Sequence, residues 1–292
     1  RGHFANASAL YTPAADSENL LEDSRAAIAA ALGCAPTELL FTASGSEGNC
    51  YIYVNGRQRI LIDAGKNTRY INDCLRQLAL SVSDLTHILI THSHADHVSA
   101  LPVLLKHTRA ALVCSSETFS AIGRKLPFGV PVQLFEPGEG FWLGQVPVKT
   151  FATSHDAPGS CGFVLGQGSE QVAVCTDLGT MSGEIFETIR GSRLVLLESN
   201  HDAEMVKNGP YPYPLKMRIL SDEGHLSNKF AAKVAVRLGE SGTKKLILAH
   251  LSDENNEPRL ALDTVCGTLA EAGVEMDVEL APRSMPGEPI LL

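Results

Sequence analysis

The sequence of 292 residues predicts an α/β fold, because strand-like and helix-like segments alternate from residue 50 onward. Apolar residues make up 44% of the chain and charged residues 20%, which is ordinary for a globular protein with a buried core. A further observation is that several apolar runs stop on a histidine or an aspartate. Such residues at the ends of successive strands gather at one edge of a sheet, where α/β proteins place their active sites.

The chain begins with a helical pattern and a short strand. Residues 17–32 carry apolar residues at helical spacing, and the apolar run 37–42 predicts a strand. Two alternating runs follow, joined by an Asn-Gly pair at 55–56. They predict a β-hairpin over residues 50–65.

The remaining elements alternate in type up to the end of the chain. Amphipathic periodicity predicts helices, and short apolar runs rich in Val, Ile and Leu predict strands. The expected helices cover residues 70–80, 99–108, 228–241 and 257–273. The expected strands cover residues 85–91, 110–115, 130–139, 147–156, 162–177, 192–202 and 244–252. The sequence has no internal repeat and no low-complexity linker, so we expect residues 41–292 to form one domain.

Composition argues against several classes of protein. No segment approaches the ~18 consecutive apolar residues that a transmembrane helix needs, and residues 1–16 lack the apolar centre of a secretion signal. Seven cysteines, an odd number scattered along the chain, favour reduced thiols over a disulfide framework. These features predict a cytoplasmic protein without membrane attachment. The net charge of −9 argues against a strongly basic nucleic-acid surface, although a local site remains compatible with it.

The motif THSHADH, residues 91–97, is the strongest indication of chemistry. It supplies two histidines, an aspartate and a third histidine directly after an apolar strand. Imidazole and carboxylate groups suit Zn²⁺ or Mn²⁺, and four of them in one tight loop cannot all bind a single tetrahedral ion that keeps an open position. Alternation predicts that His92 and His94 face one ion. Asp96 and His97 then face a second.

Three more ligands are expected at the ends of later strands. His155, Asp177 and His250 each follow an apolar run, and each alone would more readily be a satisfied core or loop residue. Together with the histidine loop they complete two metal sites. The expected first site is His92, His94 and His155, the second is Asp96, His97 and His250, and Asp177 bridges them. Two divalent ions so held would activate a shared hydroxide and stabilise the charge on a displaced group.

The histidine loop resembles the HxHxDH motif of the metallo-β-lactamase superfamily, and the later His, Asp and His follow in that superfamily's order. The match runs from about residue 44 to residue 250 and beyond. It implies an αββα sandwich with a dinuclear metal site at one edge. The superfamily includes β-lactamases, glyoxalase II, lactonases, ribonuclease Z and DNA-processing nucleases, so the motif specifies the metal chemistry better than the substrate.

Further motifs narrow this resemblance to one branch. The chain is similar to the YycJ family, also called WalJ, in six strings: SGSEGNCYIY, LIDAG, TSHD, LESNHD, YPYPLKMRILSDEGHLSN and LAHLSDENN. Members of that family are cytosolic bacterial proteins associated with nuclease activity on DNA. The resemblance therefore implies a phosphodiesterase or nuclease, with nucleic acid or another phosphodiester as its substrate.

The resemblance also assigns catalytic residues. His225 corresponds to a residue that does not bind metal and helps to protonate the leaving oxygen, with Glu198 or Asp222 as the orienting carboxylate. The alternatives are a structural histidine, or a metal ligand in place of His250. Asp96 is expected to act in catalysis as well as in metal binding.

Other polar residues are expected to contact the substrate. This set is Ser44, Ser46, Asn49, Ser227 and Asn228, although turn chemistry and capping of the helix at 228–241 are alternative roles. Basic and aromatic residues near His225 are candidates to hold phosphates or stack on bases, and a proline-rich loop with solvated charges is an equally good interpretation. These residues are Lys207, Tyr211, Tyr213, Lys216 and Arg218.

Residues 4–48 resemble a different family. The string FANASALYTPAADSENLLEDSRAAIAAALGCAPTELLFTASGSEGN is similar to the early part of aminotransferase-class cysteine desulfurases. Their pyridoxal lysine, histidine and mobile cysteine loop have no counterpart here, so that activity is not implied. We expect residues 1–40 to be an appendage, joined to the hydrolase domain at FTASGSEGN. Its apolar helix face is expected to pack on the sandwich or on a second copy of the chain, as in a homo-oligomer.

Three functions are compatible with these features. The favoured one is a dinuclear metal-dependent phosphodiesterase or nuclease. The second is a hydrolase of small esters, thioesters, lactones or β-lactams at the same metal site, which the acidic charge of the chain favours. The third is a non-catalytic sandwich whose N-terminal arm binds a partner, and a complete set of metal ligands argues against it.

Overall fold

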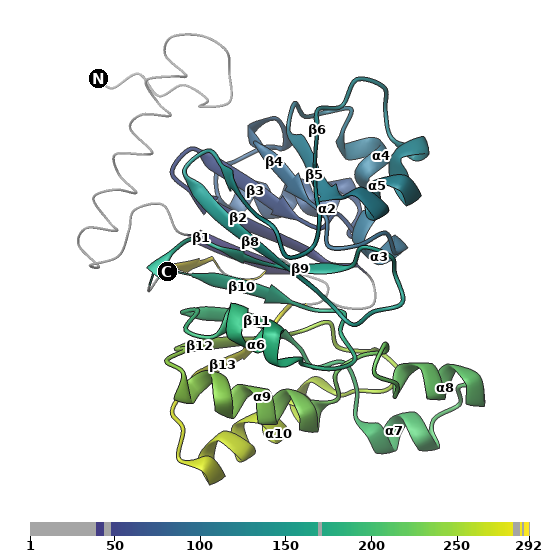
Figure 1. Cartoon of the computed structure of the whole chain (residues 1–292), viewed down its shortest axis with the longest axis vertical. Coiled ribbons are helices and arrows are strands. Elements are labelled where there is room, and N and C mark those ends of the chain that lie inside the picture. The colour runs from purple at the N-terminus through teal and green to yellow at the C-terminus, as the bar shows by residue number, and fades with distance from the viewer. Residues whose placement is uncertain (1–38, 44–47, 169–170, 283–286, 288, 292) are drawn as a thin grey trace.

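Two β-sheets pack face to face, and helices cover both outer faces (Figure 1). The computed structural model describes residues 39–43, 48–168, 171–282, 287 and 289–291. The expected αββα sandwich is confirmed. The helix expected at residues 17–32, together with Ser44 and Ser46, lies outside the described residues.

The first sheet contains seven strands. In spatial order they are β14 (Ile290–Leu291), β1 (Leu39–Ala43), β2 (Cys50–Asn55), β3 (Gln58–Ile62), β4 (His87–Leu89), β5 (Ala111–Ser115) and β6 (Val132–Phe135). The expected hairpin is present, since β2 pairs antiparallel with β3 and Asn55 lies opposite Gln58. Gly56 has a φ of 57°, a left-handed conformation that suits glycine in such a two-residue turn.

Helices between the strands cover the outer face of this sheet. They are α2 (Thr68–Gln77), α3 (Ala95–Val98), α4 (Leu101–Leu104) and α5 (Ser116–Ile122), with 3₁₀ turns at Val82–Asp84 and Gly123–Lys125. The helix α2 starts at Asn67, whose side chain accepts a hydrogen bond from the Tyr70 amide. It buries Ile71, Cys74 and Leu75 against the sheet, because these residues recur at helical spacing.

The second sheet also contains seven strands. In spatial order they are β13 (Asp277–Leu280), β12 (Lys245–Ala249), β11 (Leu194–Glu198), β10 (Val172–Cys175), β9 (Cys161–Leu165), β8 (Val146–Ala152) and β7 (Gly140–Leu143). Its outer face is covered by α6 (Gly183–Ile189), α9 (Asn228–Glu240) and α10 (Pro258–Ala272). The segment 162–177, expected as one strand, forms β9 and β10 instead, since Gly166 and Gly168 adopt positive φ between them.

Alternation along the strands builds the three apolar layers of the sandwich. On β2, Tyr51 and Tyr53 point between the two sheets, whereas Ile52 and Val54 point toward the outer helices. Each such side chain, when fully buried, contributes roughly 1.5–3 kcal/mol. The alternation in β2 thus contributes to one face of the inner layer, and the same alternation in β10, β11 and β12 contributes to the other.

Two features of the fold differ from what the sequence suggests. The strand β1 spans the expected domain boundary at residue 40 and pairs with β2 over Leu39–Ala43, so the last residues of the expected appendage continue the first sheet. Two short helices, α7 (Ala203–Asn208) and α8 (Tyr213–Ile219), occupy the connection between β11 and α9, where the sequence suggested only a proline-rich loop. Among the described residues, no helix has the length and apolarity needed to cross a bilayer.

Candidate active site

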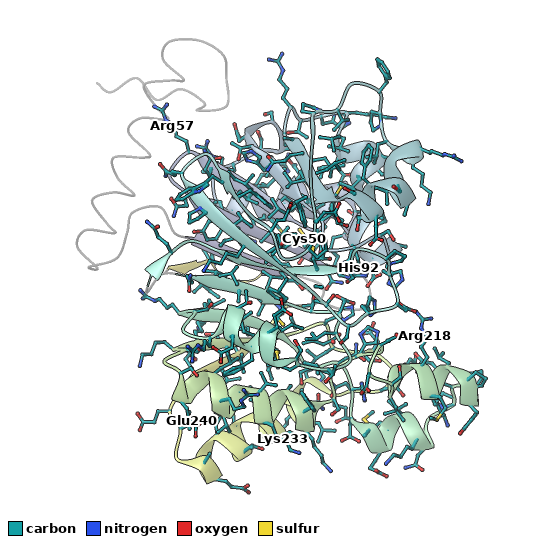
Figure 2. All side chains as sticks on the ribbon, viewed as in Figure 1. Cys50, Arg57, His92, Arg218, Lys233 and Glu240 are labelled. Atoms are coloured by element: carbon teal, nitrogen blue, oxygen red, sulfur yellow. The ribbon has the colours of Figure 1, made fainter. Side chains whose placement is uncertain are left out.

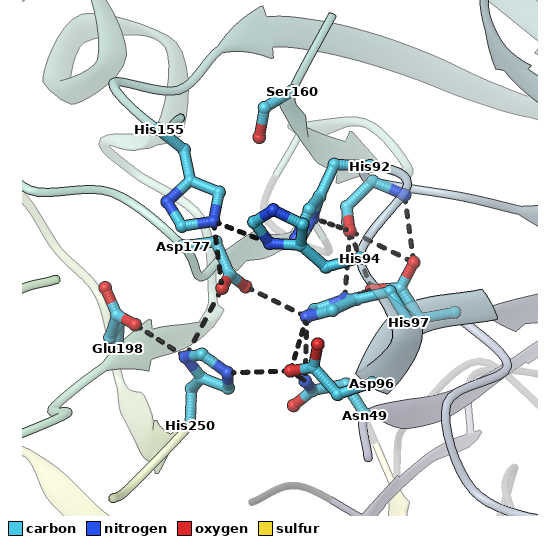
Figure 3. A network of polar contacts seen from close by, with 12 residues as sticks. Asn49, His92, His94, Asp96, His97, His155, Ser160, Asp177, Glu198 and His250 are labelled. Carbon is cyan, nitrogen blue, oxygen red and sulfur yellow. Dashed lines mark hydrogen bonds and ion pairs between the residues drawn. The ribbon is translucent and has the colours of Figure 1, made fainter. Parts of the chain in front are cut away.

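Three histidines form a first group of possible ligands at one edge of the sandwich (Figure 3). They are His92, in the loop after β4, His94, directly before α3, and His155, in the loop after β8. One nitrogen from each lies within 4.8 Å of the others, and His155 Nε2 lies 3.2 Å from His94 Nδ1. His92 Nε2 is buried and has no hydrogen-bond partner, as expected of a nitrogen that binds a cation.

A second group lies beside the first and contains a carboxylate. Asp96 Oδ2 is 3.3 Å from His97 Nε2 and 3.4 Å from His250 Nε2, so three ligand atoms converge on one point. Asp96 and His97 come from α3, whereas His250 follows β12 at the carboxyl end of the second sheet. The two sheets therefore each contribute to the group.

Asp177 stands between the two groups. Its Oδ2 is 3.4 Å from His97 Nε2 of the second group, and its Oδ1 is 3.8 Å from His155 Nε2 of the first. Asp177 Oδ2 is buried and accepts no hydrogen bond. A buried carboxylate oxygen without a donor costs several kcal/mol unless a cation compensates it, so this atom also fits a metal ligand.

A buried aspartate that the sequence analysis did not single out orients His97. Asp63, at the end of β3, accepts a hydrogen bond from His97 Nδ1 at 2.7 Å, and the Thr91 amide and hydroxyl also donate to it. This bond fixes the His97 tautomer and leaves Nε2 for the site. Asp63 lies at the end of the apolar run in LIDAG, which is the same sequence signal that marked His155, Asp177 and His250.

Glu198 plays the corresponding role for His250 and also holds His225. Its Oε1 lies 2.6 Å from His250 Nδ1 and 2.8 Å from His225 Nδ1. The amides of Leu178 and Leu226 donate to its other oxygen. Of the two carboxylates considered for His225, Glu198 is therefore the one in contact, whereas Asp222 is exposed to solvent.

The carboxylates control the electrostatics of the second group. Burial alone would lower the pKa of His97, but Asp177 and Asp63 outweigh it and raise that pKa to about 10. Burial is likewise outweighed at His250, where Asp177, Asp96 and Glu198 raise the pKa well above its ordinary value. The group thus attracts positive charge, and a cation bound there takes the place of these protons.

The first group shows the opposite balance. Burial holds the pKa of His92 well below its ordinary value, and it also lowers the pKa of His155, although Asp177 opposes the shift. Neutral imidazoles are the form that binds metals. These histidines are therefore ready to bind a cation without first losing a proton.

Three residues of the site have a strained backbone. Asp63, Asp177 and His250 have φ values of 58°, 57° and 54°, in the left-handed region that residues other than glycine rarely adopt. Each lies at the point where a strand ends and the chain turns into the site. Strain of about 1–3 kcal/mol per residue is typical of positions where the fold must aim a functional side chain.

A cavity of about 440 Å³ opens over both groups. His225 lines it, and the His225 ring lies 5.3 Å from the His155 ring and 5.2 Å from the His250 ring. Burial would lower the pKa of His225, but Glu198 outweighs it and raises that pKa. The Nδ1 contact with Glu198 leaves Nε2 as the nitrogen available to a molecule in the cavity.

The other residues expected at the site have mixed positions. The side-chain nitrogen of Asn49, Nδ2, lies 2.9 Å from His97 Nε2 and donates to the Asp96 carboxylate, so Asn49 touches the second group directly. Ser227 caps α9 by accepting from the Phe230 amide. Asn228 is buried and bonded to Ser199 and Asn256. Neither Ser227 nor Asn228 lines the cavity, and their contact with a substrate stays a prediction.

The basic and aromatic residues near His225 also separate into two sets. Tyr211 and Arg218 line the cavity. Lys207 pairs with Glu204 on α7, Lys216 donates to the Lys207 carbonyl, and Tyr213 is largely exposed outside the cavity. The five residues are close together in the sequence, but only one face of α8 and the turn before it line the cavity, whereas Lys207 lies on α7.

The donor set as a whole fits divalent cations. Imidazole nitrogens and carboxylate oxygens suit Zn²⁺ and Mn²⁺, and two atoms of the expected ligand residues, His92 Nε2 and Asp177 Oδ2, are buried without a hydrogen-bond partner. Six described cysteines are free, and five of them are buried in the core. No cysteine belongs to a possible metal-binding group among the residues that the structure describes.

Comparison with known families agrees with the fold and the motif. The family model of the beta-lactamase superfamily domain matches residues 58–251, which include His92, Asp177 and His250. The chain belongs to the metallo-β-lactamase superfamily. It is accordingly a metal-dependent hydrolase, and its superfamily fold implies bound divalent metal ions.

Similar proteins place the chain in one branch of the superfamily. It is 33% identical over 241 residues to exodeoxyribonuclease WalJ of Streptococcus pneumoniae, covering 81% of this chain and 90% of that protein. It is 34% identical over 234 residues to exodeoxyribonuclease YycJ of Bacillus anthracis, covering 79% and 88%. The expected resemblance to the YycJ family is thus confirmed.

A solved structure supports the architecture. The metallo-β-lactamase fold protein YhfI from Bacillus subtilis superposes with a TM-score of 0.63 at 17% identity, covering 86% of this chain and 99% of that one. At this identity the likeness concerns the fold.

Proposed function

We propose that this hydrolase is an exodeoxyribonuclease that uses two divalent cations, Zn²⁺ or Mn²⁺. The first group, His92, His94 and His155, would hold one cation, the second group, Asp96, His97 and His250, would hold the other, and Asp177 would contact both. Bound there, the two ions would acidify a water molecule and neutralise charge on the phosphate. The names and coverage of the WalJ and YycJ relatives support DNA as the substrate.

The observation that carries the proposal is the position of His225. It lines the cavity over the two ligand groups, it belongs to neither of these expected groups, and it is held by Glu198 at 2.8 Å. Hydrolysis of a phosphodiester releases an alkoxide, which is a poor leaving group until it receives a proton. A protonated His225, stabilised by Glu198, can supply that proton from Nε2.

The two buried carboxylates would keep the site in its working geometry. Asp63 and Glu198 each fix the ring orientation and tautomer of one histidine of the second group. Glu198 also aligns His225, so a single side chain sets the distance between the proton donor and His250. Asn49 would keep Asp96 in place through its amide.

A panel of substrates tests this function. The purified protein is supplied with Zn²⁺ or Mn²⁺ and assayed side by side on linear single-stranded and double-stranded DNA, closed circular DNA, RNA, bis-p-nitrophenyl phosphate and nitrocefin. We expect hydrolysis of linear DNA with release of mononucleotides, and resistance of circular DNA. Hydrolysis of nitrocefin without any cleavage of phosphodiesters would contradict the proposal and favour a hydrolase of small molecules.

Metal analysis tests the second part of the proposal. Two equivalents of cation per chain are expected after reconstitution and removal of free metal. One equivalent or less in a protein with full activity would exclude the use of two cations.

A further inference from the structure

The short helix α8 forms one wall of the cavity above the candidate metal groups. Its residues Leu215, Arg218 and Ile219 line the cavity, and Tyr211 joins them from the turn before the helix. Positions 215, 218 and 219 are three or four residues apart, so they share one helical face. No residue of α8 is fully buried, and the apolar members of this face are half-exposed. The face therefore offers a molecule in the cavity both apolar surface and a cation.

Arg218 has an unusual position in the charge pattern of the cavity. Of the described residues that line it, Arg218 is the one lysine or arginine. The acidic residues of the lining are Asp96, Asp177, Glu223, Asp253 and Glu254. A polyanion that extends beyond the metal groups would meet carboxylates in several directions. The positive charge of Arg218, by contrast, would attract a second phosphate on that side of the cavity.

Arg218 is held in this position by Asp156. Its guanidinium pairs with one oxygen of Asp156, and the other oxygen lies 3.5 Å from His94 Nε2 and from His155 Nε2. The Asp156 carboxylate thus connects the arginine to the first histidine group. The arginine side chain is 56% exposed, and an exposed pair of this kind contributes only about 0–1 kcal/mol. A phosphate can therefore engage the guanidinium, which has five N–H donors, at little cost.

The end of α8 is packed closely against the segment that carries His225. The His225 amide donates to the Ile219 carbonyl at 3.2 Å. A Cβ atom on Gly224 would lie 2.3 Å from the carbonyl oxygens of Arg218 and Ile219, so only glycine permits this approach. The end of α8 and the segment that carries His225 are consequently held against each other beside the cavity. Figure 2 shows Arg218 at the same edge of the molecule as His92.

We propose that Arg218 binds the phosphate next to the one that is hydrolysed, while Tyr211, Leu215 and Ile219 support the adjoining nucleobase. This assignment rests on the proposed nuclease function and makes α8 the element that holds the DNA strand beside the cleaved bond. A guanidinium matches the geometry of a phosphate with two parallel hydrogen bonds. An aromatic ring beside it suits any base, because every base has a face to stack.

The test compares Arg218→Ala with Lys216→Ala, a control on the same helix whose side chain lies outside the cavity. Binding of an internally labelled single-stranded oligodeoxynucleotide with phosphorothioate linkages is measured by fluorescence anisotropy at several salt concentrations in Mn²⁺. Loss of a charge-assisted contact should weaken binding by Arg218→Ala about tenfold or more. The slope of log affinity against log salt should fall by about 0.7, and Lys216→Ala should change neither value.

Two further variants separate charge from shape. Arg218→Lys should keep the salt slope of the wild type and bind with intermediate affinity, since it retains the charge without the two parallel donors. Tyr211→Leu should lower affinity about fivefold or more at an unchanged salt slope, because stacking is not ionic. In turnover of linear DNA, Arg218→Ala should raise KM more than it lowers kcat.

The outcomes of this test and of the substrate panel are distinct. Wild-type protein that neither binds nor cleaves any oligonucleotide refutes the nuclease function itself. Wild-type protein that cleaves DNA while Arg218→Ala matches it in affinity and salt slope refutes the role of Arg218 alone.

Discussion

The two ligand groups of the site have similar residues and different surroundings. In the second group, a buried carboxylate orients each histidine, with Asp63 bonded to His97 and Glu198 to His250. In the first group, His92 Nδ1 contacts only the Thr91 hydroxyl, and His155 Nδ1 is buried without a partner. Buried carboxylates therefore orient His97 and His250, whereas the carboxylate beside the first group, Asp156, is partly exposed and lies 3.5 Å from the Nε2 atoms of His94 and His155.

Because of this difference, the two groups suit different divalent cations. Three imidazoles suit Zn²⁺, while a group with a carboxylate ligand and two buried carboxylate partners also accommodates harder cations such as Mn²⁺. The second group lies next to Glu198, which also holds His225. We infer that proton delivery is coupled in geometry to the second group, because Glu198 contacts both His225 and His250.

Replacement of the residue common to both groups should have the largest effect. Asp177→Asn removes the negative charge but keeps a residue that tolerates the left-handed backbone at this position. We expect activity to fall to background and the metal content to drop below two equivalents, as measured by elemental analysis. Activity comparable to the wild type would show that the groups work independently.

Removal of His225 should spare both groups. We expect His225→Ala to lower kcat on linear DNA by about 10²–10⁴-fold, in the range typical of a lost general acid, with unchanged metal content. A substrate with a good leaving group, such as bis-p-nitrophenyl phosphate, should lose much less, since its departure needs no proton. Loss of a metal equivalent in this variant would make His225 a ligand and extend the second group.

The buried carboxylates should matter to one group only. Asp63→Asn should weaken the binding of the cation in the second group by about 10–100-fold and leave the cation in the first group unaffected. Calorimetric titration of metal-free protein with Mn²⁺ measures the affinities of the two groups separately. Asp156→Asn, next to the first group but half-exposed, is the matched control and should change metal affinity less. Equal losses at both sites in Asp63→Asn would remove the distinction between the groups.

The smallest effect is expected from residues outside both groups. We propose that residues 1–38 are an appendage, so their removal should leave metal content and kcat/KM within a factor of about two, the usual tolerance of a distant and independent change. The strand β1 begins at Leu39 and is retained in this truncation because it pairs with β2. A truncated protein that folds, as judged by circular dichroism, but loses activity would make the appendage part of the site.

Much of this site could be predicted because strand ends are visible in a sequence. His92, His155 and His250 each follow an apolar run, and parallel strands bring such positions to one edge. Asp63 follows the same rule, but a single acidic residue after a strand is also common in ordinary turns, so the sequence alone does not distinguish it. Its role depends on the contact with His97, which is 34 residues away in the sequence and is formed only by the fold.

The residues around the cavity were harder to predict. Asn228 precedes a helix and carries a polar side chain, but the direction of that side chain depends on Ser199 and Asn256, which belong to other segments. Arg218 and Lys216 are similar in sequence, and only the register of α8 decides which of them faces the site. The three prolines at positions 210, 212 and 214 suggested a loop, yet a proline at the start of a helix is well tolerated.

The left-handed backbone at Asp63, Asp177 and His250 has a consequence for protein engineering. Glycine or asparagine at any of these positions would relax the main chain, so screens for heat resistance should favour such substitutions there. Each gain would come at the cost of a group that holds or orients a cation. Libraries made to improve thermal stability should therefore leave these three residues unchanged and vary the helices of the outer layers.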